Sequence, residues 1–210
     1  NTWYMKRFAG LSEDGLSLWY YTDKETNEEK TTTTYSTGDF YLCGDPNPDL
    51  YGGFGTSITF HGFDLSTQFS YLVGGLTYDY GYAGMMGNPT ATSVGNRWHK
   101  DVLKAWSPEN PSSTIPRWYF NDLNTTGSSD RFLIDGSYLN LQNIQVGYTL
   151  PDSWTSHLKI KNLRLYFVCD NVYYWSKRKG LDPRRSISGV GTSGKIAPFR
   201  TYSGGISLQF

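Results

Sequence analysis

The chain lacks any hydrophobic run long enough for a transmembrane helix, which would need about 20 apolar residues. Charge is also sparse: Lys, Arg, Asp and Glu make up 18% of the 210 residues and cancel to a formal net charge of zero, so no attraction to nucleic acid is expected. Two cysteines and three histidines show no CxxC motif and no histidine pairing. We therefore expect no metal, no cofactor and no catalytic Ser-His-Asp arrangement, and Cys43 and Cys169 form either a disulfide or two free thiols.

Aromatic residues and glycine are abundant. The chain has 17 Tyr, 11 Phe, 7 Trp and 23 Gly, yet its mean hydropathy is −0.51. Many aromatics and glycines with few charges are typical of a β-rich protein that meets an interface. The first residue is Asn1 and no signal peptide is visible, which favours a processed or partial chain.

Alternation of apolar and polar residues predicts five strands, at 53–62, 64–75, 138–150, 160–173 and 199–210. The first two form a hairpin around a turn at Gly62 and Phe63. Leu139 and Leu141 are out of phase with the rest of their strand, which implies a β-bulge or a strand that leaves the bilayer. A further strand pair is possible at 3–11 and 16–22.

The polar faces of these strands carry almost no charge. Asp64 is the only charged residue in 53–73, and 138–150 has none. Soluble sandwiches cover their solvent face with Lys and Glu, whereas Ser, Thr, Gln, Asn and Gly suit the lumen of a large membrane barrel. We predict that these residues face lipid: Phe54, Ile58, Phe60, Leu65, Phe69, Tyr71, Val146, Leu163, Leu165, Phe167, Ile206 and Leu208. These are predicted to face the lumen: Ser57, Thr59, Gln68, Ser70, Gln145 and Gln209.

The connections between the strands alternate in length. Short ones lie at Gly62–Phe63 and 151–157, and long ones at 76–136 and 175–198. Because outer-membrane barrels have short periplasmic turns and long external loops, the long connections are predicted to lie outside the cell. Five strands cannot close such a barrel, so the rest must come from a longer chain or from further copies.

Several strings resemble the C-terminal third of SusC/RagA-type TonB-dependent outer-membrane transporters. The strings cover the chain in order: AGLSEDGLSLWYY (9–21), GDPNPDLYGGFGTSITFHGFDLSTQFSY (44–71), RWHKDVLKAWSPENPSSTIPRW (97–118), DGSYLNLQNIQVGYTLP (135–151), LRLYFVCDNVYYW (163–175) and GLDP (180–183). The terminal aromatic, Phe210, completes the resemblance. In the first string, Ser12 stands where the family usually has Asp.

The resemblance implies an all-β fold, in which this chain is an antiparallel segment of a 22-stranded barrel in the bacterial outer membrane. It further implies a plug domain, a TonB box that couples to the TonB complex, and a SusD-like surface lipoprotein over the mouth. The whole of 1–210 would then be C-terminal barrel, with the plug and earlier strands elsewhere. The implied activity is import of oligomeric nutrients, glycans first and peptides second. The alternative is a soluble β-sandwich module that binds carbohydrate through its aromatics.

The long connection at 76–136 contains the candidate contact residues Trp98, Trp106, Arg117 and Trp118. A short helix is predicted over 97–106. These side chains either stack on sugar rings, dock the SusD-like partner, or pack the loop on itself.

Three smaller motifs have weaker claims. GVGTSG (189–194) matches a phosphate-loop pattern but precedes no helix, so a flexible external loop is expected. The alternating Asp45, Asn47 and Asp49 favour a turn cluster over a calcium loop. The glycosylation sequon at 124–126 is a chance match.

The resemblance implies that the last strand is a barrel-assembly signal made of Tyr202, Ile206, Leu208 and Phe210.

Overall fold

The computed structural model describes residues 2–91, 95, 97–122, 124–125, 127–155, 160–177, 182–185 and 198–210. The chain divides into two compact units. The sheet unit comprises residues 48–74, 136–184 and 195–210, and the loop unit comprises residues 1–47, 75–135 and 185–194.

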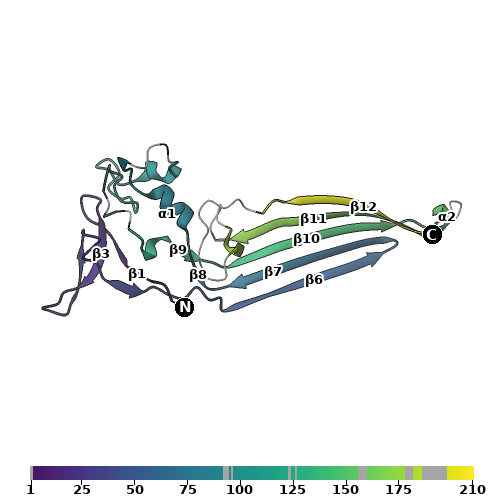
Figure 1. Cartoon of the computed structure of the whole chain (residues 1–210), viewed down its shortest axis with the longest axis horizontal. Coiled ribbons are helices and arrows are strands. Elements are labelled where there is room, and N and C mark those ends of the chain that lie inside the picture. The colour runs from purple at the N-terminus through teal and green to yellow at the C-terminus, as the bar shows by residue number, and fades with distance from the viewer. Residues whose placement is uncertain are drawn as a thin grey trace. The chain divides into compact units, whose positions relative to one another are not determined.

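The sheet unit is a five-stranded antiparallel meander (Figure 1). Its spatial order is β12-β11-β10-β7-β6, so all five predicted strands are confirmed. Their bounds are β6 (Leu50–Phe60), β7 (Phe63–Val73), β10 (Tyr138–Thr149), β11 (Asn162–Ser176) and β12 (Thr201–Gln209). The short helix α2 (Asp152–Thr155) follows β10, and a 3-10 turn, η5 (Pro183–Arg185), follows β11.

The turn between β6 and β7 lies one residue earlier than predicted. His61 and Gly62 both have positive φ, at 46° and 84°, and Phe60 pairs directly with Phe63. Two positive φ values in a two-residue loop match the right-handed twist of the flanking strands. Phe63 is therefore a strand residue, and His61 and Gly62 form the turn.

A β-bulge explains the phase change in β10. The register shifts between Leu141 and Asn143 relative to both neighbouring strands. Leu139 pairs with Tyr71 and Leu141 with Phe69, so both leucines lie on the apolar face. They do so although each is an odd number of residues before Ile144, because the bulge adds one residue to the strand. The bulge interpretation is confirmed.

Cross-strand pairing separates an apolar and a polar face, and this separation matches the predicted sets. Ile58, Leu65, Val146 and Phe167 are successive partners in one row. Ser57, Ser66, Gln145 and Val168 form the adjacent row on the opposite face.

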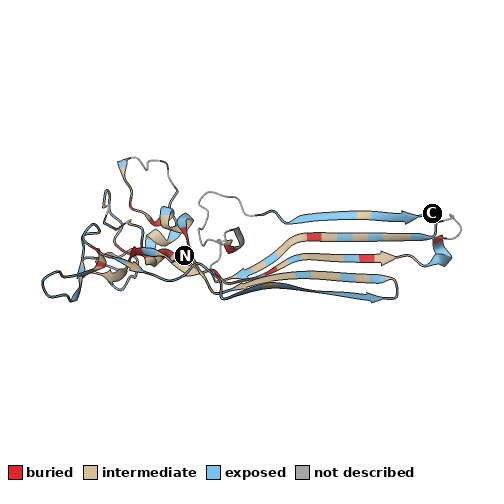
Figure 2. Ribbon diagram, turned by 60° about the horizontal axis from the view of Figure 1, so that its bottom comes forward, coloured by how far each residue is buried: buried red, intermediate tan, exposed pale blue. Residues whose placement is uncertain are grey.

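The apolar face is not packed on a second sheet, since the described part of the sheet unit contains only this one. Exposure runs along the strands (Figure 2) and reaches 57% at Ile58, 49% at Phe167 and 65% at Ile206. A continuous exposed apolar surface of this kind fits contact with lipid and contradicts the β-sandwich alternative.

The described residues of the loop unit form three small sheets around one core. Its elements are β1 (Tyr4–Lys6), β2 (Phe8–Leu11), β3 (Ser17–Thr22), β4 (Glu29–Thr32), β5 (Phe40–Leu42), β8 (Leu76–Tyr78), α1 (Tyr80–Met86), η2 (Lys100–Lys104), η3 (Asp130–Phe132) and β9 (Leu133–Asp135). The pairings are β1-β5, β2-β3-β4 and β8-β9. Met5, Tyr78, Met86 and Phe132 form the buried core. The suggested strand pair at 3–11 and 16–22 exists as β2 and β3, but it extends to β4 and does not join the five-stranded sheet.

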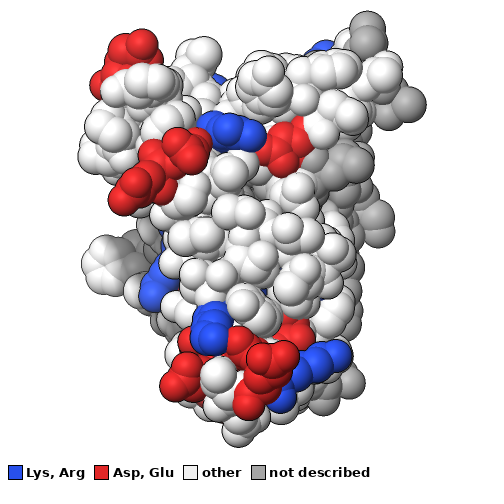
Figure 3. Space-filling model, turned by 90° about the vertical axis from the view of Figure 1, so that its left-hand side faces the viewer, with Lys and Arg blue, Asp and Glu red and all other residues white. Residues whose placement is uncertain are grey.

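Charges of both signs lie close together on this unit. Figure 3 looks onto the left-hand side of Figure 1 and shows acidic and basic side chains gathered near its lower end. Two ion pairs lie in β2–β4 and the adjoining hairpin: Arg7 pairs with Glu29 at 2.8 Å and Lys30 with Asp23 at 2.5 Å. These two pairs partly neutralise the charges of the hairpin.

The helix predicted over 97–106 is shorter and of another type. It is the 3-10 helix η2, whose N-cap residue His99 accepts a hydrogen bond at Nδ1 from the Asp101 amide. Helices of this length gain little from α-helical propagation, and single 3-10 turns are common in connections. Among the described residues, no helix is both long and apolar enough to cross a membrane.

Candidate functional site

An ion pair crosses three strands on the polar face. Arg164 of β11 donates from Nε to Asp64 Oδ1 at 2.9 Å and from Nη2 to Asp64 Oδ2 at 2.5 Å. Gly147 of β10 lies between them: a Cβ there would lie 2.4 Å from Asp64 Oδ1 and 2.5 Å from Arg164 Nη2. The missing side chain is what allows β7 and β11 to be linked across β10.

A second glycine on this face lies under an aromatic ring. Gly205 of β12 pairs with Tyr166 of β11, and a Cβ at Gly205 would lie 2.4 Å from the ring. The Arg164 guanidinium lies 5.4 Å from the same ring centroid, within range of a cation–π interaction. The polar face thus presents aromatic and charged groups together.

A third cluster fixes part of the connection after β11 to the polar face. Arg184 forms a two-pronged contact with Asp182, from Nε and Nη2, each 2.7 Å long. It also donates from Nη1 to Asn140 Oδ1 of β10 at 2.7 Å, and its guanidinium lies 4.6 Å from the Tyr174 ring. The side chains of Arg184 and Asp182 are only 13% and 7% exposed. Planar bidentate pairs are the strong class of charged hydrogen bond.

Sequence reasoning missed this cluster. The sequence predicts only a long connection at 175–198, although Asp182 and Arg184 are two residues apart around Pro183. The signal available was the short Asp-Pro-Arg-Arg string. It does not reveal the partner, Asn140, because that contact spans 44 positions.

The structure brings together two of the four predicted loop residues. The rings of Trp98 and Trp118 meet edge-to-face with centroids 5.3 Å apart. Trp118 donates from Nε1 to the Gly87 carbonyl at 3.2 Å and is 38% exposed. These two tryptophans form one partly accessible aromatic surface.

Trp106 and Arg117 contact the N-terminal part of the loop unit. Gly15 has a φ of 73°, and a Cβ there would lie 2.3 Å from the Trp106 indole. The Arg117 amide donates to the Gly15 carbonyl at 2.8 Å, while its guanidinium lies 3.6 Å from Asp122 Oδ2 and 5.5 Å from the Tyr119 ring. Both residues therefore contact Gly15, which lies outside the connection at 76–136.

Two exposed aromatics beside Trp118 were not singled out from the sequence. Tyr119 is 65% exposed and Phe120 is 60% exposed. The WYF run at 118–120 was the signal for them. Aromatic residues of this kind anchor protein interfaces when a partner covers them.

Buried charges hold the loop unit together. Lys6 is 5% exposed, and its Nζ donates to the carbonyls of Tyr35, Ser36 and Gly38 at 2.5, 3.2 and 2.7 Å. Burial lowers the pKa of Lys6, an effect that Asp39 partly offsets. Burial likewise lowers the pKa of Arg131 to about 10.

The last strand has the predicted alternation. Tyr202, Ile206 and Leu208 pair with Cys169, Leu165 and Leu163 on the apolar face. Phe210 lies just beyond β12, is 73% exposed, and its carbonyl accepts a hydrogen bond from Lys161 Nζ at 3.0 Å.

Both cysteines are free thiols. Asp45 accepts a hydrogen bond from the Asn47 amide at 2.7 Å, as in a turn. In the described part of the chain, no cluster of three or more His, Cys, Asp or Glu suits a metal ion. GVGTSG lies outside the described residues.

Known proteins resemble this chain over nearly all of its length. TonB-dependent receptor P3 of Formosa agariphila is 30% identical over 212 residues, which cover 96% of this chain and 20% of that receptor. TonB-dependent receptor SusC of Bacteroides thetaiotaomicron is 27% identical over 180 residues, which cover 84% of this chain and 17% of SusC. No family model matches.

Solved structures agree with these relatives. The RagAB peptide transporter matches with a TM-score of 0.81 and 26% identity, over 100% of this chain and 23% of the matched chain. Its 'closed-closed' state matches with a TM-score of 0.82 and 25% identity, over 100% of this chain and 23% of that chain. The chain thus spans about a fifth of the length of the curated relatives it matches. With a two-faced antiparallel sheet that matches part of the RagAB structure, the chain belongs to the SusC/RagA-type TonB-dependent receptors of the bacterial outer membrane.

Proposed function

We propose that this chain forms part of the barrel of a transporter that imports oligomeric nutrients across the outer membrane. The observation that carries the proposal is the sheet's division into an exposed apolar face and a polar face lined by ion pairs, tyrosines and amides. The first matches lipid and the second a water-filled passage. The plug, the other strands and the contact with the TonB complex belong to parts of the transporter outside 1–210.

Glycans are the substrate class that we place first, and peptides second. The polar face offers ring surfaces at Tyr166 and Tyr174 beside guanidinium groups, an arrangement that suits sugar rings and their hydroxyls. Peptides are favoured by the similarity to RagAB, which is named a peptide transporter.

Uptake by the full-length transporter tests the function. We expect deletion of its gene to abolish energised uptake of one oligomer class, measured with labelled oligosaccharides and oligopeptides in parallel. Complementation should restore uptake, and a TonB-uncoupled strain should not show it. Unchanged uptake of both classes after deletion would refute the transport proposal.

We also propose that the connection at 76–136 contacts a SusD-like surface lipoprotein through Trp98, Trp118 and the neighbouring Tyr119 and Phe120. Trp118→Ala in the full-length transporter should weaken lipoprotein binding about 30-fold, because truncating a central aromatic anchor costs roughly 2 kcal/mol or more. Biolayer interferometry measures the Kd. The control is Leu103→Ala, at a side chain that is 90% exposed. Equal Kd values for the two variants would contradict the assignment.

A further proposal is that Tyr202, Ile206, Leu208 and Phe210 act as the barrel-assembly signal. An edge strand with unpaired backbone groups can pair with the assembly machinery before the barrel closes, and a terminal aromatic is favoured at the membrane interface. Deleting Phe210 from the full-length transporter should slow the appearance of the heat-modifiable, membrane-inserted form, followed by pulse-chase electrophoresis. Unchanged insertion kinetics would remove the proposal.

A further inference from the structure

A layer of planar groups lies on the polar face of the sheet. Asp64, Gly147, Tyr166 and Gly205 are successive cross-strand partners on β7, β10, β11 and β12, and so form one row. The two glycines leave room directly above the sheet, and two side chains of β11 occupy that room: Arg164 above Gly147, and Tyr166 above Gly205.

The Tyr166 ring lies along the sheet and does not point straight away from it. A Cβ at Gly205 would lie 2.4 Å from both Cζ and Oη of Tyr166 and 2.9 Å from its Cε1, so the far end of the ring covers Gly205. The residue is partly exposed. One side of the ring therefore rests on β12, and the other side is turned toward the space in front of the polar face.

Arg164 extends in the opposite direction, across Gly147 to Asp64. The charges of this pair cancel, and its two side chains are 27% and 22% exposed. The guanidinium has N–H groups beyond those that bind Asp64, and each carboxylate oxygen has a further lone pair, so the pair can both donate and accept hydrogen bonds. The row from Asp64 to Gly205 crosses three strand spacings, roughly 14 Å at about 4.8 Å each.

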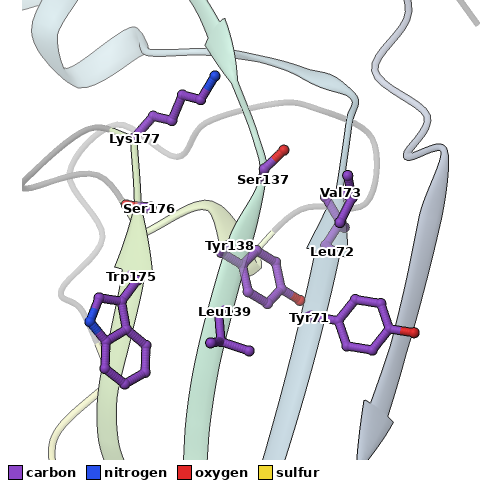
Figure 4. A pocket seen from close by; sticks show the side chains of 9 residues that line it. All are labelled: Tyr71, Leu72, Val73, Ser137, Tyr138, Leu139, Trp175, Ser176 and Lys177. Atoms are coloured by element: carbon purple, nitrogen blue, oxygen red, sulfur yellow. The ribbon is translucent and has the colours of Figure 1, made fainter.

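The aromatic rings of the apolar face are arranged differently. Figure 4 shows Tyr71 and Trp175 of that face, which line a hollow of about 460 Å³ near the end of β7. These rings pack beside other rings: Trp175 meets Tyr173 edge-to-face with centroids 4.9 Å apart, and Tyr71 lies 6.4 Å from Phe54. In the described part of the sheet, no other ring packs on Tyr166. The surface of Tyr166 that is turned away from Gly205 can therefore stack on a ligand.

We propose that Tyr166, Arg164 and Asp64 form a platform that binds a neutral oligosaccharide during import. One sugar ring stacks with its C–H face on Tyr166, and hydroxyls of the next ring form hydrogen bonds with Arg164 and Asp64. Sugar hydroxyls both donate and accept, as this ion pair does, and its cancelled charge gives no preference for an ionised cargo. The inference deepens the proposed function and rests on it.

Calorimetric titration of the full-length transporter in detergent tests the platform. The probes are maltotriose, cellotriose and mannotriose, with N-acetylated, C-amidated trialanine as an uncharged peptide comparator. We expect the wild-type protein to bind at least one trisaccharide more tightly than the peptide. Tyr166→Ala should raise the Kd of the tightest-binding trisaccharide about tenfold, the scale of losing one stacked ring. Tyr166→Phe keeps the ring and should change that Kd by less than about twofold.

Two neighbouring glycines provide a matched pair of variants. Gly205→Ala removes no group that the sugar contacts, but its methyl group would displace the Tyr166 ring from the sheet, so the Kd should rise by a similar factor. Gly204 pairs with Phe167 on the apolar face, and a Cβ there would meet the Tyr166 carbonyl oxygen at 3.8 Å, an ordinary contact. Gly204→Ala should therefore bind the trisaccharide as the wild-type protein does.

Equal Kd values for Tyr166→Ala and Gly204→Ala would overturn the platform. So would a wild-type protein that binds no trisaccharide, or one that binds the peptide more tightly. Heat-modifiability confirms that each variant is folded. Because the readout is equilibrium binding and not energised uptake, an unchanged Kd in Tyr166→Ala removes the platform and leaves the transport proposal standing, whereas uptake that survives gene deletion removes transport and leaves the binding result standing.

Discussion

Ile144→Arg is expected to destabilise the membrane-inserted transporter by about 2–4 kcal/mol, the cost of a cationic side chain near the midplane of a barrel's lipid face. Ile144 pairs with Thr67 and Cys169 on the apolar face. Its row lies near the middle of β7, since Thr67 is four residues from Phe63 and six from Val73. An arginine there is too far from either interface for its guanidinium to reach water easily.

The adjacent residue provides a matched control. Gln145 lies on the polar face between Ser66 and Val168, so Gln145→Arg should change stability by less than about 1 kcal/mol, as an ordinary surface substitution does. Chemical unfolding of the two full-length variants in lipid vesicles measures the difference. Equal destabilisation, or a larger effect at Gln145, would mean that the two faces are assigned the wrong way round.

Arg184→Ala is expected to release the segment 182–185 from the sheet. Removing one partner of a buried ion pair costs about 3–5 kcal/mol, so the local free energy of unfolding of this segment should fall by about that amount. The substitution takes away two hydrogen bonds to Asp182 and one to Asn140. Asn140 is 4% exposed, so its carbonyl oxygen loses a partner where water has little access. The affected region should exchange amide hydrogens faster, measured by mass spectrometry.

Arg184→Lys separates charge from geometry. Lysine keeps the positive charge but cannot form the planar two-pronged contact, so most of the protection should still be lost. A double-mutant cycle with Asp182→Ala isolates the pair, and we expect a coupling energy of about 1–3 kcal/mol. A coupling energy near zero would show that the segment is held by other contacts.

The sheet was predictable from the sequence because each strand repeats a period-two pattern that pairing then preserves. Leu165 and Ile206 illustrate this, since alternation alone places them on one face and the register makes them partners. The hairpin turn was displaced by one residue because a positive φ at His61 has no clear sequence signal, whereas glycine at 62 does.

The loop unit was less predictable because its contacts join distant segments. Trp106 packs on Gly15, a contact that follows no local period. In the sheet unit, the contact from Arg184 to Asn140 is equally non-local. The loop helix was predicted from apolar spacing, which does not distinguish one 3-10 turn from an α-helix over five residues. Trp98 and Trp118 could be named as candidates, but their contact depends on the path of the whole connection.

The bulge in β10 determines which changes of length this strand tolerates. Gln142 is the extra residue between Leu141 and Asn143, so its deletion would restore strict alternation and leave every other side chain on its present face. Deleting one residue elsewhere, such as Gln145, would rotate half of the strand and expose Asn140 to lipid. Insertions and deletions in β10 are therefore subject to a parity rule, under which the strand varies by even numbers of residues except at position 142.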